Sequence, residues 1–434
     1  MKYFIETYGC QMNVADSEVV SSILNQQGYV KAQKLEEADI ILINTCSIRE
    51  NAETRVKGRL SLFSKYKNAN HAIVGVLGCM AERLKEELIA HNKTVDMVVG
   101  PDSYRLLPQL IEQARSGKRM VEAMLSDDET YEDIIPVRYD SNGVSTFVSI
   151  MRGCQNFCSY CIVPYVRGVE RSRSPETIIN EIKDIEQKNY KEVTLIGQNV
   201  DSYQYHDVNF SLLLEKVAKT FPSLRIRFST NHPKDLNDNV LHVMAQYSNI
   251  CHHIHLPVQS GSNHMLQLMN RGYTREYYLE RIAAIRKYIP DSAISTDIMV
   301  GFCDETEHDH EQTLSLMREV GYDFAFMFKY SERSGTYAAK NMTDNVPEKL
   351  KIKRLNEVIA LQNELSKISK QNDVGKIYEV LIEGKSKRSD KEFMGRNSQN
   401  KVIVFPSEIT LKVGDKVMVK VEKYTSATLI GKII

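Results

Sequence analysis

The chain has 434 residues, enough for two to four domains, and its 56 Lys and Arg balance 56 Asp and Glu, so its net charge gives no sign of a polyanionic partner. Its composition of 42% hydrophobic and 26% charged residues is that of an ordinary soluble protein, without the roughly 18-residue apolar run of a membrane span or the apolar length of a signal peptide. Eight cysteines without a secretory context favour reduced thiols and metal binding over disulfides, so we expect a cytoplasmic protein with no membrane association.

Residues 1–118 alternate between strand and helix patterns. The expected strands are residues 2–8, 39–44, 73–77 and 97–99, and the expected helices are residues 14–24, 50–66, 81–90 and 104–115. The run Asp39–Asn44 is almost continuously apolar, as in parallel strands that are covered on both faces. The alternation predicts a small doubly wound parallel sheet.

A cysteine follows each of the first three expected strands, at Cys10, Cys46 and Cys79. The carboxyl ends of parallel strands share one edge of the sheet, where ligands characteristically bind. We therefore expect these thiols to converge and to hold a metal cluster with one open iron. Three unrelated buried cysteines are the alternative.

Residues 119–143 are interpreted as a linker. The stretch Ser126–Asp133 has few apolar residues and charges of one sign, which is typical of a solvated connector between domains. A role facing the substrate is the alternative for this acidic stretch.

Six strand patterns separated by helical patterns follow within residues 144–371. The expected strands are residues 144–151, 192–197, 224–229, 252–256, 293–300 and 324–330. Six units are too few for the closed eightfold barrel of alternating strands and helices. Polar residues such as Gln198, Asn199 and Ser229 come at the ends of these strands, which favours a ligand pocket over a series of unrelated turns.

The loop after the first of these strands carries Cys154, Cys158 and Cys161 at the spacing C-x3-C-x2-C. A zinc knuckle or an electron-carrying iron–sulfur site would need a fourth close ligand, and the next cysteine is Cys251. A metal held by these three thiols therefore keeps an open coordination position. Cys251 could join His253 and His255 on one face of a strand to bind zinc, although a polar strand with a chance cysteine is the alternative.

Residues 348–434 carry 18 Lys and Arg against 11 Asp and Glu, so this segment is locally basic. A long helical pattern over 348–370 precedes short strand patterns at residues 377–384, 401–405, 416–421 and 428–431, which predict a small all-β barrel. We expect this barrel to bind RNA, with a purely structural cap as the alternative. The expected phosphate contacts are Lys385, Lys387, Arg388 and Arg396, and Phe393 is the candidate for stacking on a base.

Several motifs resemble those of the radical S-adenosylmethionine (SAM) methylthiotransferase family. The C-x3-C-x2-C loop, with Tyr160 before its third cysteine, is similar to the cluster motif of radical SAM enzymes. The stretches Thr7–Asn13, Asn44–Glu50 and Gly78–Arg83 resemble the three cysteine motifs that precede it in this family. The residues 395–397, 414–415 and 429–431 resemble the TRAM domain, a module of RNA-modifying proteins.

This resemblance implies two 4Fe-4S clusters, each held by three cysteines, and SAM bound among Tyr160, Gln198, Asn199 and Ser229. It also implies an open, partial (β/α)6 barrel between the doubly wound sheet and the TRAM barrel, with domains at residues 1–118, 144–371 and 372–434. In the family, the Cys154/Cys158/Cys161 cluster reduces SAM to a 5'-deoxyadenosyl radical. The Cys10/Cys46/Cys79 cluster carries the sulfur that is methylated and transferred.

Within the family, the stretches 153–165, 197–203 and 255–262 most resemble members that convert N6-isopentenyladenosine next to the anticodon to its 2-methylthio derivative. The implied partners are the anticodon stem-loop of tRNA, a sulfur source and an electron donor such as flavodoxin or ferredoxin. Threonylcarbamoyl-adenosine in tRNA or an aspartate of a ribosomal protein is the alternative substrate. A non-enzymatic iron–sulfur RNA-binding or electron-transfer protein is the alternative of another class. The basic segment Arg167–Arg173 is expected to guide the RNA backbone or to form a solvated helix entry.

Overall fold

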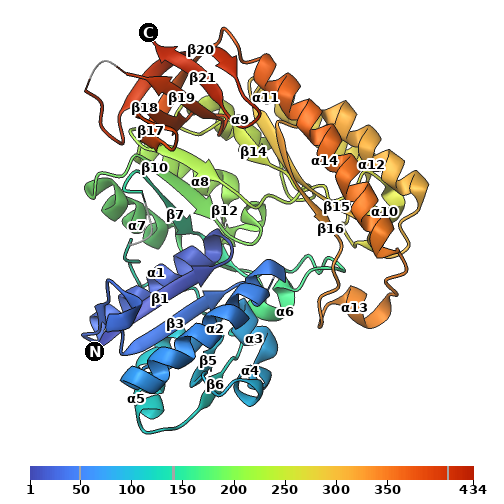
Figure 1. The fold of residues 1–434 in the computed structure, drawn as a ribbon. Helices are drawn as coiled ribbons and strands as arrows, with labels where there is room; N and C mark the ends of the chain where they lie inside the picture. Colours follow the sequence, from blue (N-terminus) through green and yellow to red (C-terminus); the bar gives the residue numbers. More distant parts are fainter. Residues whose placement is uncertain (48–49, 139–141, 408–409) are drawn as a thin grey trace.

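The computed structural model describes residues 1–47, 50–138, 142–407 and 410–434, and the side chains of residues 50–54 are outside this description. Figure 1 shows a central body of strands and helices with one smaller body at each end. The N-terminal sheet lies at one end, and the C-terminal β-barrel lies at the other end. Part of the expected motif Asn44–Glu50, namely Ile48 and Arg49, falls outside the described residues.

The N-terminal body contains a six-stranded parallel sheet in the order β2-β1-β3-β4-β5-β6. Its strands are β1 (Lys2–Tyr8), β2 (Val30–Lys31), β3 (Ile40–Thr45), β4 (Ile73–Gly78), β5 (Met97–Val99) and β6 (Met120–Glu122). The expected doubly wound parallel sheet is confirmed. The short edge strands β2 and β6 extend it beyond the four strands predicted from the sequence.

Helices cover both faces of this sheet, because alternate residues of the buried strands face opposite sides. Ile40 and Leu42 pack in one core with residues of α1 (Gln11–Gln26) and α5 (Leu107–Arg115), whereas Ile41 and Ile43 pack on the other face. That second face is covered by α2 (Glu50–Asn70), α3 (Cys79–Leu84) and α4 (Glu86–His91). The single helix expected over 81–90 is two helices, because Lys85 between them has a φ of 42°. Short 3-10 turns, η1 (Leu35–Glu37) and η2 (Tyr104–Leu106), complete this body.

Parts of the predicted linker 119–143 belong to the N-terminal body, although Asp127, Asp128 and Asp133 in the stretch Ser126–Asp133 are exposed as expected. β6 pairs with β5 in the sheet, and Tyr131 and Ile134 are buried in the same core as α1. The acidic residues Glu129 and Asp133 both accept hydrogen bonds from Arg105. Isolated apolar residues among the acidic ones therefore anchor the segment to the N-terminal body. Residues 139–141 lie outside the described part of the chain.

The central body is an open barrel made of two three-stranded parallel sheets, β7-β10-β13 and β14-β15-β16. A single parallel bridge between Ile226 and Ile250 is the contact where the two sheets meet. The strands are β7 (Ser145–Ser149), β10 (Glu192–Ile196), β13 (Arg225–Phe228), β14 (His253–His255), β15 (Ala293–Val300) and β16 (Phe324–Lys329). All six strands fall within the expected ranges, and the expected partial barrel is confirmed.

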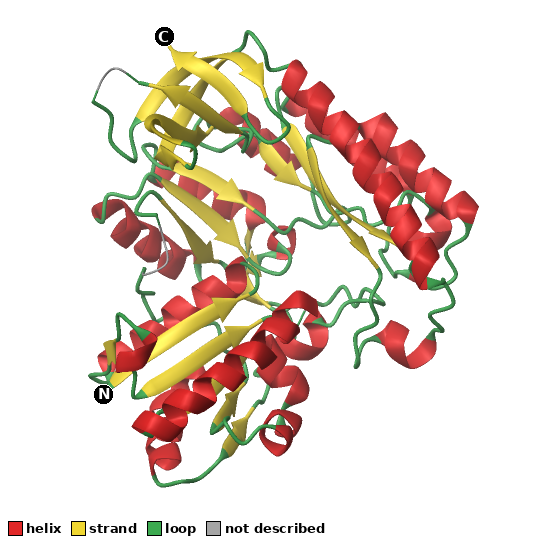
Figure 2. Cartoon of the chain, in the orientation of Figure 1, coloured by secondary structure: helices red, strands yellow, loops and turns green. Residues whose placement is uncertain are grey.

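Helices that connect these strands, together with α14 (Glu348–Gln371) after the last strand, form the outer layer of the open barrel, and the short helix α13 (Tyr337–Asn341) lies apart from it (Figures 1 and 2). The connecting helices are α7 (Pro175–Gln187), α8 (Phe210–Thr220), α9 (Asp238–Gln246), α10 (Asn263–Leu268), α11 (Arg275–Tyr288) and α12 (Glu307–Val320). Smaller elements at the edge of this body are β8 (Met151–Arg152), α6 (Val163–Arg167), β9 (Arg171–Ser172), η3 (Val200–Ser202), β11 (Gln204–Tyr205) and β12 (Val208–Asn209).

The C-terminal body is a closed five-stranded barrel in the order β17-β18-β19-β21-β20. Its strands are β17 (Ile377–Ser386), β18 (Ser389–Arg396), β19 (Val402–Pro406), β20 (Lys416–Tyr424) and β21 (Leu429–Ile433). The sequence predicted four of these strands and missed β18, whose first residues are mostly charged or polar. The expected small all-β barrel is confirmed.

The C-terminal barrel docks on the end of the central barrel where its strands begin. Arg227 of β13 donates hydrogen bonds to the carbonyl oxygens of Asn397 and Ser398, at 2.7 and 3.0 Å. Lys401 pairs with Asp323, just before β16, at 2.8 Å. Since the functional loops of such barrels follow the carboxyl ends of the strands, the C-terminal barrel sits at the opposite end from those loops.

None of the helices within the described ranges is long and apolar enough to cross a membrane.

Candidate functional site

Cys10, Cys46 and Cys79, which we call the N-terminal trio, lie at the carboxyl edge of the sheet. Each follows a strand directly or after one residue: β1, β3 and β4 respectively. Cys10 and Cys46 are hydrogen-bonded to each other, and Cys79 is close enough to Cys10 to interact with its charge. Cys10 therefore lies beside both Cys46 and Cys79 at this edge of the sheet, and a cluster held by all three thiols stays a prediction.

Two asparagines from the cysteine motifs hold this edge together. The amide of Asn13 donates hydrogen bonds to Asn44 Oδ1 at 3.1 Å and to the carbonyl oxygen of Thr45 at 3.2 Å, while Asn44 donates in return to the carbonyl oxygen of Asn13 at 3.0 Å. Gly78 has a φ of 88°, and a Cβ at this position would lie 2.3 Å from Asn44 Oδ1. Glycine is required before Cys79 because any side chain would displace this asparagine pair.

The thiols of the N-terminal trio have different electrostatic environments. A hydrogen bond with Cys46 lowers the pKa of Cys10 to about 6, and the charge of Arg167 acts in the same direction against the effect of burial. Burial raises the pKa of Cys79, although Arg167 opposes this shift. Arg167 Nε donates to Cys79 Sγ at 3.2 Å, so one buried guanidinium stabilises negative charge on this trio.

Cys154, Cys158 and Cys161, which we call the loop trio, lie in the segment between β8 and α6. The Cys154 N–H donates to the Gly168 carbonyl oxygen at 3.1 Å, and the Cys161 N–H donates to the Cys158 carbonyl oxygen at 2.9 Å. Burial raises the pKa of Cys154 to about 11 and also raises that of Cys161. Metal binding requires thiolates, so assembly of a cluster here would release protons.

The loop trio also contacts a buried arginine. Arg271 Nη1 donates to Cys158 Sγ at 3.2 Å and to Tyr160 Oη at 3.3 Å. The remaining donors of Arg271 are directed to Tyr273 and to the Pro257 carbonyl oxygen. Each trio thus has one arginine N–H aimed at one of its sulfur atoms.

The two trios lie at opposite ends of the short helix α6. This helix begins two residues after Cys161, and its last residue, Arg167, is hydrogen-bonded to Cys79. Ile162 and Val166 pack with Cys79 in one small apolar cluster. Six residues at helical rise span about 9 Å, so the two trios are neighbours although they belong to different bodies of the chain.

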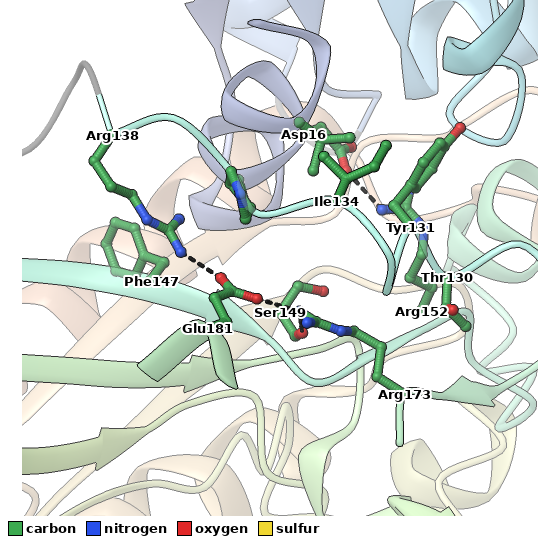
Figure 3. Close-up of a pocket in the computed structure, with 13 residues that line it drawn as sticks. Asp16, Thr130, Tyr131, Ile134, Arg138, Phe147, Ser149, Arg152, Arg173 and Glu181 are labelled. Atoms are coloured by element: carbon green, nitrogen blue, oxygen red, sulfur yellow. Dashed lines mark hydrogen bonds and ion pairs between the residues drawn. The ribbon is translucent and has the colours of Figure 1, made fainter. Parts of the chain in front are cut away.

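Figure 3 shows the interface between the N-terminal body and the central barrel, where charged side chains are buried in pairs. Asp16 of α1 pairs with Arg152 at 2.8 Å and with Arg167 at 2.7 Å. Arg138 joins Glu18 of the N-terminal body to Glu181 of α7. These pairs fix the orientation of the two bodies beside the trios.

The interpretation of Arg167–Arg173 as an RNA guide or a solvated helix entry is wrong. Arg167, Arg171 and Arg173 are only 2%, 6% and 4% exposed. Arg171 pairs with Asp102 of the N-terminal body at 2.8 Å, and Arg173 pairs with Glu181. Asp102, the partner of Arg171, lies 69 positions away in the sequence, so the cluster of basic residues gave no sign of its burial.

Of the four residues expected at a SAM site, Tyr160 lies in the loop that carries the loop trio, and Gln198, Asn199 and Ser229 follow the carboxyl ends of β10 and β13. Gln198 Oε1 accepts a hydrogen bond from the Gly153 N–H at 2.5 Å, which ties the end of β10 to the residue before Cys154. Asn199 is 1% exposed and donates to Asp235 at 2.7 Å, but its Oδ1 has no hydrogen-bond partner among the described residues. Tyr160 is bonded to Arg271, and the Ser229 N–H donates to the Leu195 carbonyl oxygen at 3.2 Å.

No group of three or more His, Cys, Asp or Glu side chains within the described ranges, the two cysteine trios included, is arranged to hold a single metal ion. The two histidines of the zinc site considered for Cys251, His253 and His255 share a different hydrogen-bond partner. His253 Nε2 and His255 Nδ1 are instead hydrogen-bonded to Ser295 Oγ, at 3.0 and 2.9 Å. The strand β14 is therefore a polar strand within the barrel.

The structure separates the residues expected to contact RNA into two groups. Lys385, Lys387 and Arg388 are exposed at the turn between β17 and β18, and Arg396 is ion-paired with Glu383 at 2.9 Å. Phe393 is 6% exposed because its ring packs against Phe405 in the barrel core, and the Lys385 ammonium covers it at 3.5 Å. The expectation that Phe393 stacks on a base is therefore wrong.

Comparison with family models divides the chain into three segments. Residues 148–317 match the radical SAM superfamily, residues 371–434 match the TRAM domain, and residues 2–100 match a family described as "Uncharacterized protein family UPF0004". The open barrel and its three-cysteine loop thus define the class: this is a radical SAM protein.

Relatives that match nearly the whole chain indicate which radical SAM family it belongs to. The chain is 58% identical to the tRNA-2-methylthio-N(6)-dimethylallyladenosine synthase of Bacteroides thetaiotaomicron, over 99% of this chain and 96% of the relative. It is 56% identical to the synthase of the same name from Bacteroides fragilis, over 99% and 95%. The chain belongs to the family of these synthases, which are radical SAM methylthiotransferases.

Two solved structures share the fold at low sequence identity. The radical SAM methyltransferase TsrM of Kitasatospora setae has a TM-score of 0.58 and 10% identity, over 76% of this chain and 72% of that chain. The cobalamin-dependent SAM radical enzyme OxsB has a TM-score of 0.54 and 14% identity, over 83% and 56%. Both likenesses concern the fold alone.

Proposed function

We propose that the chain converts N6-dimethylallyladenosine, also called N6-isopentenyladenosine, in tRNA to its 2-methylthio derivative. The names of relatives at 53–58% identity over 99–100% of this chain support this reaction. The observation that carries the proposal is the position of the two trios at the two ends of α6, since two cofactors that act on one nucleobase must be neighbours. A cytoplasmic location accords with a tRNA substrate.

The donor sets fit two 4Fe-4S clusters. Each trio supplies three thiols and no fourth cysteine, and each has a buried arginine N–H directed at a sulfur atom. In this proposal the loop trio holds the cluster that binds SAM, and the N-terminal trio holds the cluster that delivers sulfur. When bound, this pair of cofactors supplies the radical that opens an unactivated C–H bond and the sulfur that replaces its hydrogen.

The chain's own residues bind and position the reactants. Tyr160, Gln198, Asn199 and Ser229 are the proposed SAM contacts, and the buried, unpartnered Oδ1 of Asn199 is a free acceptor for such a ligand. The proposed phosphate contacts of the anticodon stem-loop are Lys385, Lys387, Arg388 and Arg396. The proposed division of labour follows the domain ranges: residues 1–118 deliver sulfur, residues 144–371 cleave SAM, and residues 372–434 hold RNA. The electron donor is a flavodoxin or ferredoxin, and an external source replenishes the sulfur.

Nucleoside mass spectrometry tests the reaction. Purified protein with reconstituted clusters, SAM and reductant is incubated under anaerobic conditions with tRNA that carries N6-dimethylallyladenosine. The expected product is the 2-methylthio derivative of that nucleoside. A methylthio group on threonylcarbamoyl-adenosine or on a ribosomal protein, with none on the prenylated nucleoside, would refute the proposed substrate.

Two cysteine variants test the division between the trios. Cys46→Ala is expected to keep SAM cleavage to 5'-deoxyadenosine measurable and to abolish methylthio transfer, whereas Cys158→Ala should stop both. The iron content should fall from about eight to about four per chain in either variant. Equal loss of cleavage in the two variants would contradict separate clusters, and no cleavage by the unaltered protein would favour an iron–sulfur carrier.

A further inference from the structure

Arg167 connects helix α6 to the N-terminal trio across the interface between the N-terminal body and the central barrel. It closes helix α6, which starts beside the loop trio, and its Nε donates to Cys79 of the N-terminal trio at 3.2 Å. Its side chain is 3% exposed, so water contributes little to its solvation. A buried guanidinium in this position must find its partners in the protein or in a bound group.

The protein satisfies only part of this guanidinium. Asp16 pairs with Arg167 Nη2 at 2.7 Å, but the same carboxylate also forms an ion pair with Arg152 at 2.8 Å. Arg167 Nη1 is buried and has no hydrogen-bond partner within the described ranges. A donor that is left unpaired in the interior costs stability, and its position beside the thiols indicates an acceptor that binds there.

The charged side chains around Arg167 also favour a negatively charged group. The buried network contains three cations, Arg152, Arg167 and Arg171, and two anions, Asp16 and Asp102. Counted without the thiols, this network is one positive charge in excess, and the cation in it that touches a thiol is Arg167. Three thiolates and an iron–sulfur core with one further electron form a strongly electron-rich group, which matches this excess.

We propose that Arg167 is a positioning residue for the cluster on the N-terminal trio, and that its N–H groups raise the reduction potential of that cluster by stabilising the reduced form. This inference rests on the proposed second cluster. Hydrogen bonds to cluster sulfur atoms and nearby charge are the levers by which proteins set such potentials. Because Arg167 also closes α6, the same side chain fixes the N-terminal trio relative to the loop trio.

The test isolates the cluster in question. The triple variant in which Cys154, Cys158 and Cys161 are all alanine retains only the N-terminal trio, and its cluster is titrated with reductant and followed by EPR. In this background Arg167→Met should lower the reduction potential by at least 59 mV, which corresponds to a tenfold change in a one-electron equilibrium. Arg167→Lys keeps the charge but not the planar fork, so it should shift the potential in the same direction by less.

Arg171→Met is the matched control. Arg171 belongs to the same buried network and pairs with Asp102. Its Nη1 and Nη2 donate to oxygen acceptors, and none of its hydrogen bonds within the described ranges goes to a thiol. Its removal takes away one charge without removing an N–H···S bond, and the potential should stay within a third of the shift seen for Arg167→Met. An equal shift in Arg171→Met, or unchanged potentials in both Arg167 variants, would overturn the inference.

The outcomes also separate this inference from the proposed function. If the triple variant with Arg167 intact assembles no cluster, the proposed second cluster fails. If it assembles one and Arg167→Met leaves the potential unchanged, the cluster stands and the role of Arg167 fails. Should Arg167→Met not fold, the Arg167→Lys measurement decides in the same way.

Discussion

Asp16 is the residue on which the buried contact between the N-terminal body and the central barrel depends most directly. Its side chain is 1% exposed and accepts from Arg152 at 2.8 Å and pairs with Arg167 at 2.7 Å. Replacing it with asparagine preserves the shape but removes the charge that both guanidiniums face. Breaking a buried ion pair by removing one partner costs about 3 to 5 kcal/mol, and we expect a loss in this range for Asp16→Asn.

Urea denaturation of the cluster-free protein, followed by far-ultraviolet circular dichroism, measures this loss. With a slope of about 3 kcal/mol per molar urea, the transition should move down by about 1 M or more. The control is Glu112→Gln, because Glu112 pairs with Arg115 on the surface, where both side chains are more than half exposed. Such a pair contributes about 1 kcal/mol or less. A loss for Asp16→Asn no larger than for Glu112→Gln would refute the reasoning.

The difference in unfolding free energy between the unaltered protein and Asp16→Asn should depend on pH. Burial acts to raise the pKa of Asp16, but Arg152 and Arg167 outweigh it and hold this pKa below 3.8. A depressed carboxyl pKa stabilises the folded state above the unfolded-state value and loses that effect as pH falls through the folded-state value. The difference between the unaltered protein and Asp16→Asn should therefore be constant from pH 5 to 7 and shrink below about pH 4. A difference that grows with acidity would contradict the ion pair.

Two further predictions concern RNA and the loop trio. The combined substitution of Lys385, Lys387 and Arg388 by alanine should weaken tRNA binding. It should also reduce the slope of log affinity against log salt concentration by the amount that corresponds to up to about three lost phosphate contacts. Filter binding at several salt concentrations measures both effects. Lys118→Ala, at an exposed site of the N-terminal body, is the control, and equal losses in the two would argue against the C-terminal barrel as the RNA contact. Gly153→Ala should reduce the iron bound by the loop trio while leaving that of the N-terminal trio, because Gly153 has a φ of 81° and a Cβ there would lie 1.7 Å from the Val169 carbonyl oxygen. Full iron content in this variant would show that the loop tolerates the change.

Local sequence patterns were sufficient to predict most of the architecture. The apolar run 39–44 and its neighbours placed the central strands of the first sheet, because strands covered on both faces need continuous apolar side chains. The edge strands β2 and β6 escaped prediction because two or three residues carry no periodicity. Strand β18 escaped because its pairing on both sides within a closed barrel, and not its own charged sequence, determines its conformation.

The positions of Cys10, Cys46 and Cys79 after three neighbouring strands could also be predicted, because strand ends and cysteine spacing are both visible in one sequence. The ion-paired interface could not. Asp16 and Arg152 lie 136 positions apart, and a cluster of arginines such as Arg167–Arg173 looks the same in the sequence whether it faces water or a distant carboxylate. The prediction for Phe393 failed for a related reason. An aromatic residue beside basic ones suggests a nucleic-acid surface, but side chains of β18 alternate between the two faces of the strand, and Phe393 lies on the face that packs in the barrel core.

The C-terminal barrel docks at the end where the central strands begin. A nucleic acid must therefore exceed a minimum length to contact both ends of the molecule at once. The eight residues of β15 alone measure about 26 Å at strand rise. A free nucleoside or a minimal loop can reach only one end at a time. Progressive shortening of an RNA hairpin should therefore produce an abrupt loss of affinity at the length where the RNA no longer reaches the C-terminal barrel. The rate of methylthio transfer at saturating RNA should show no abrupt change at that length.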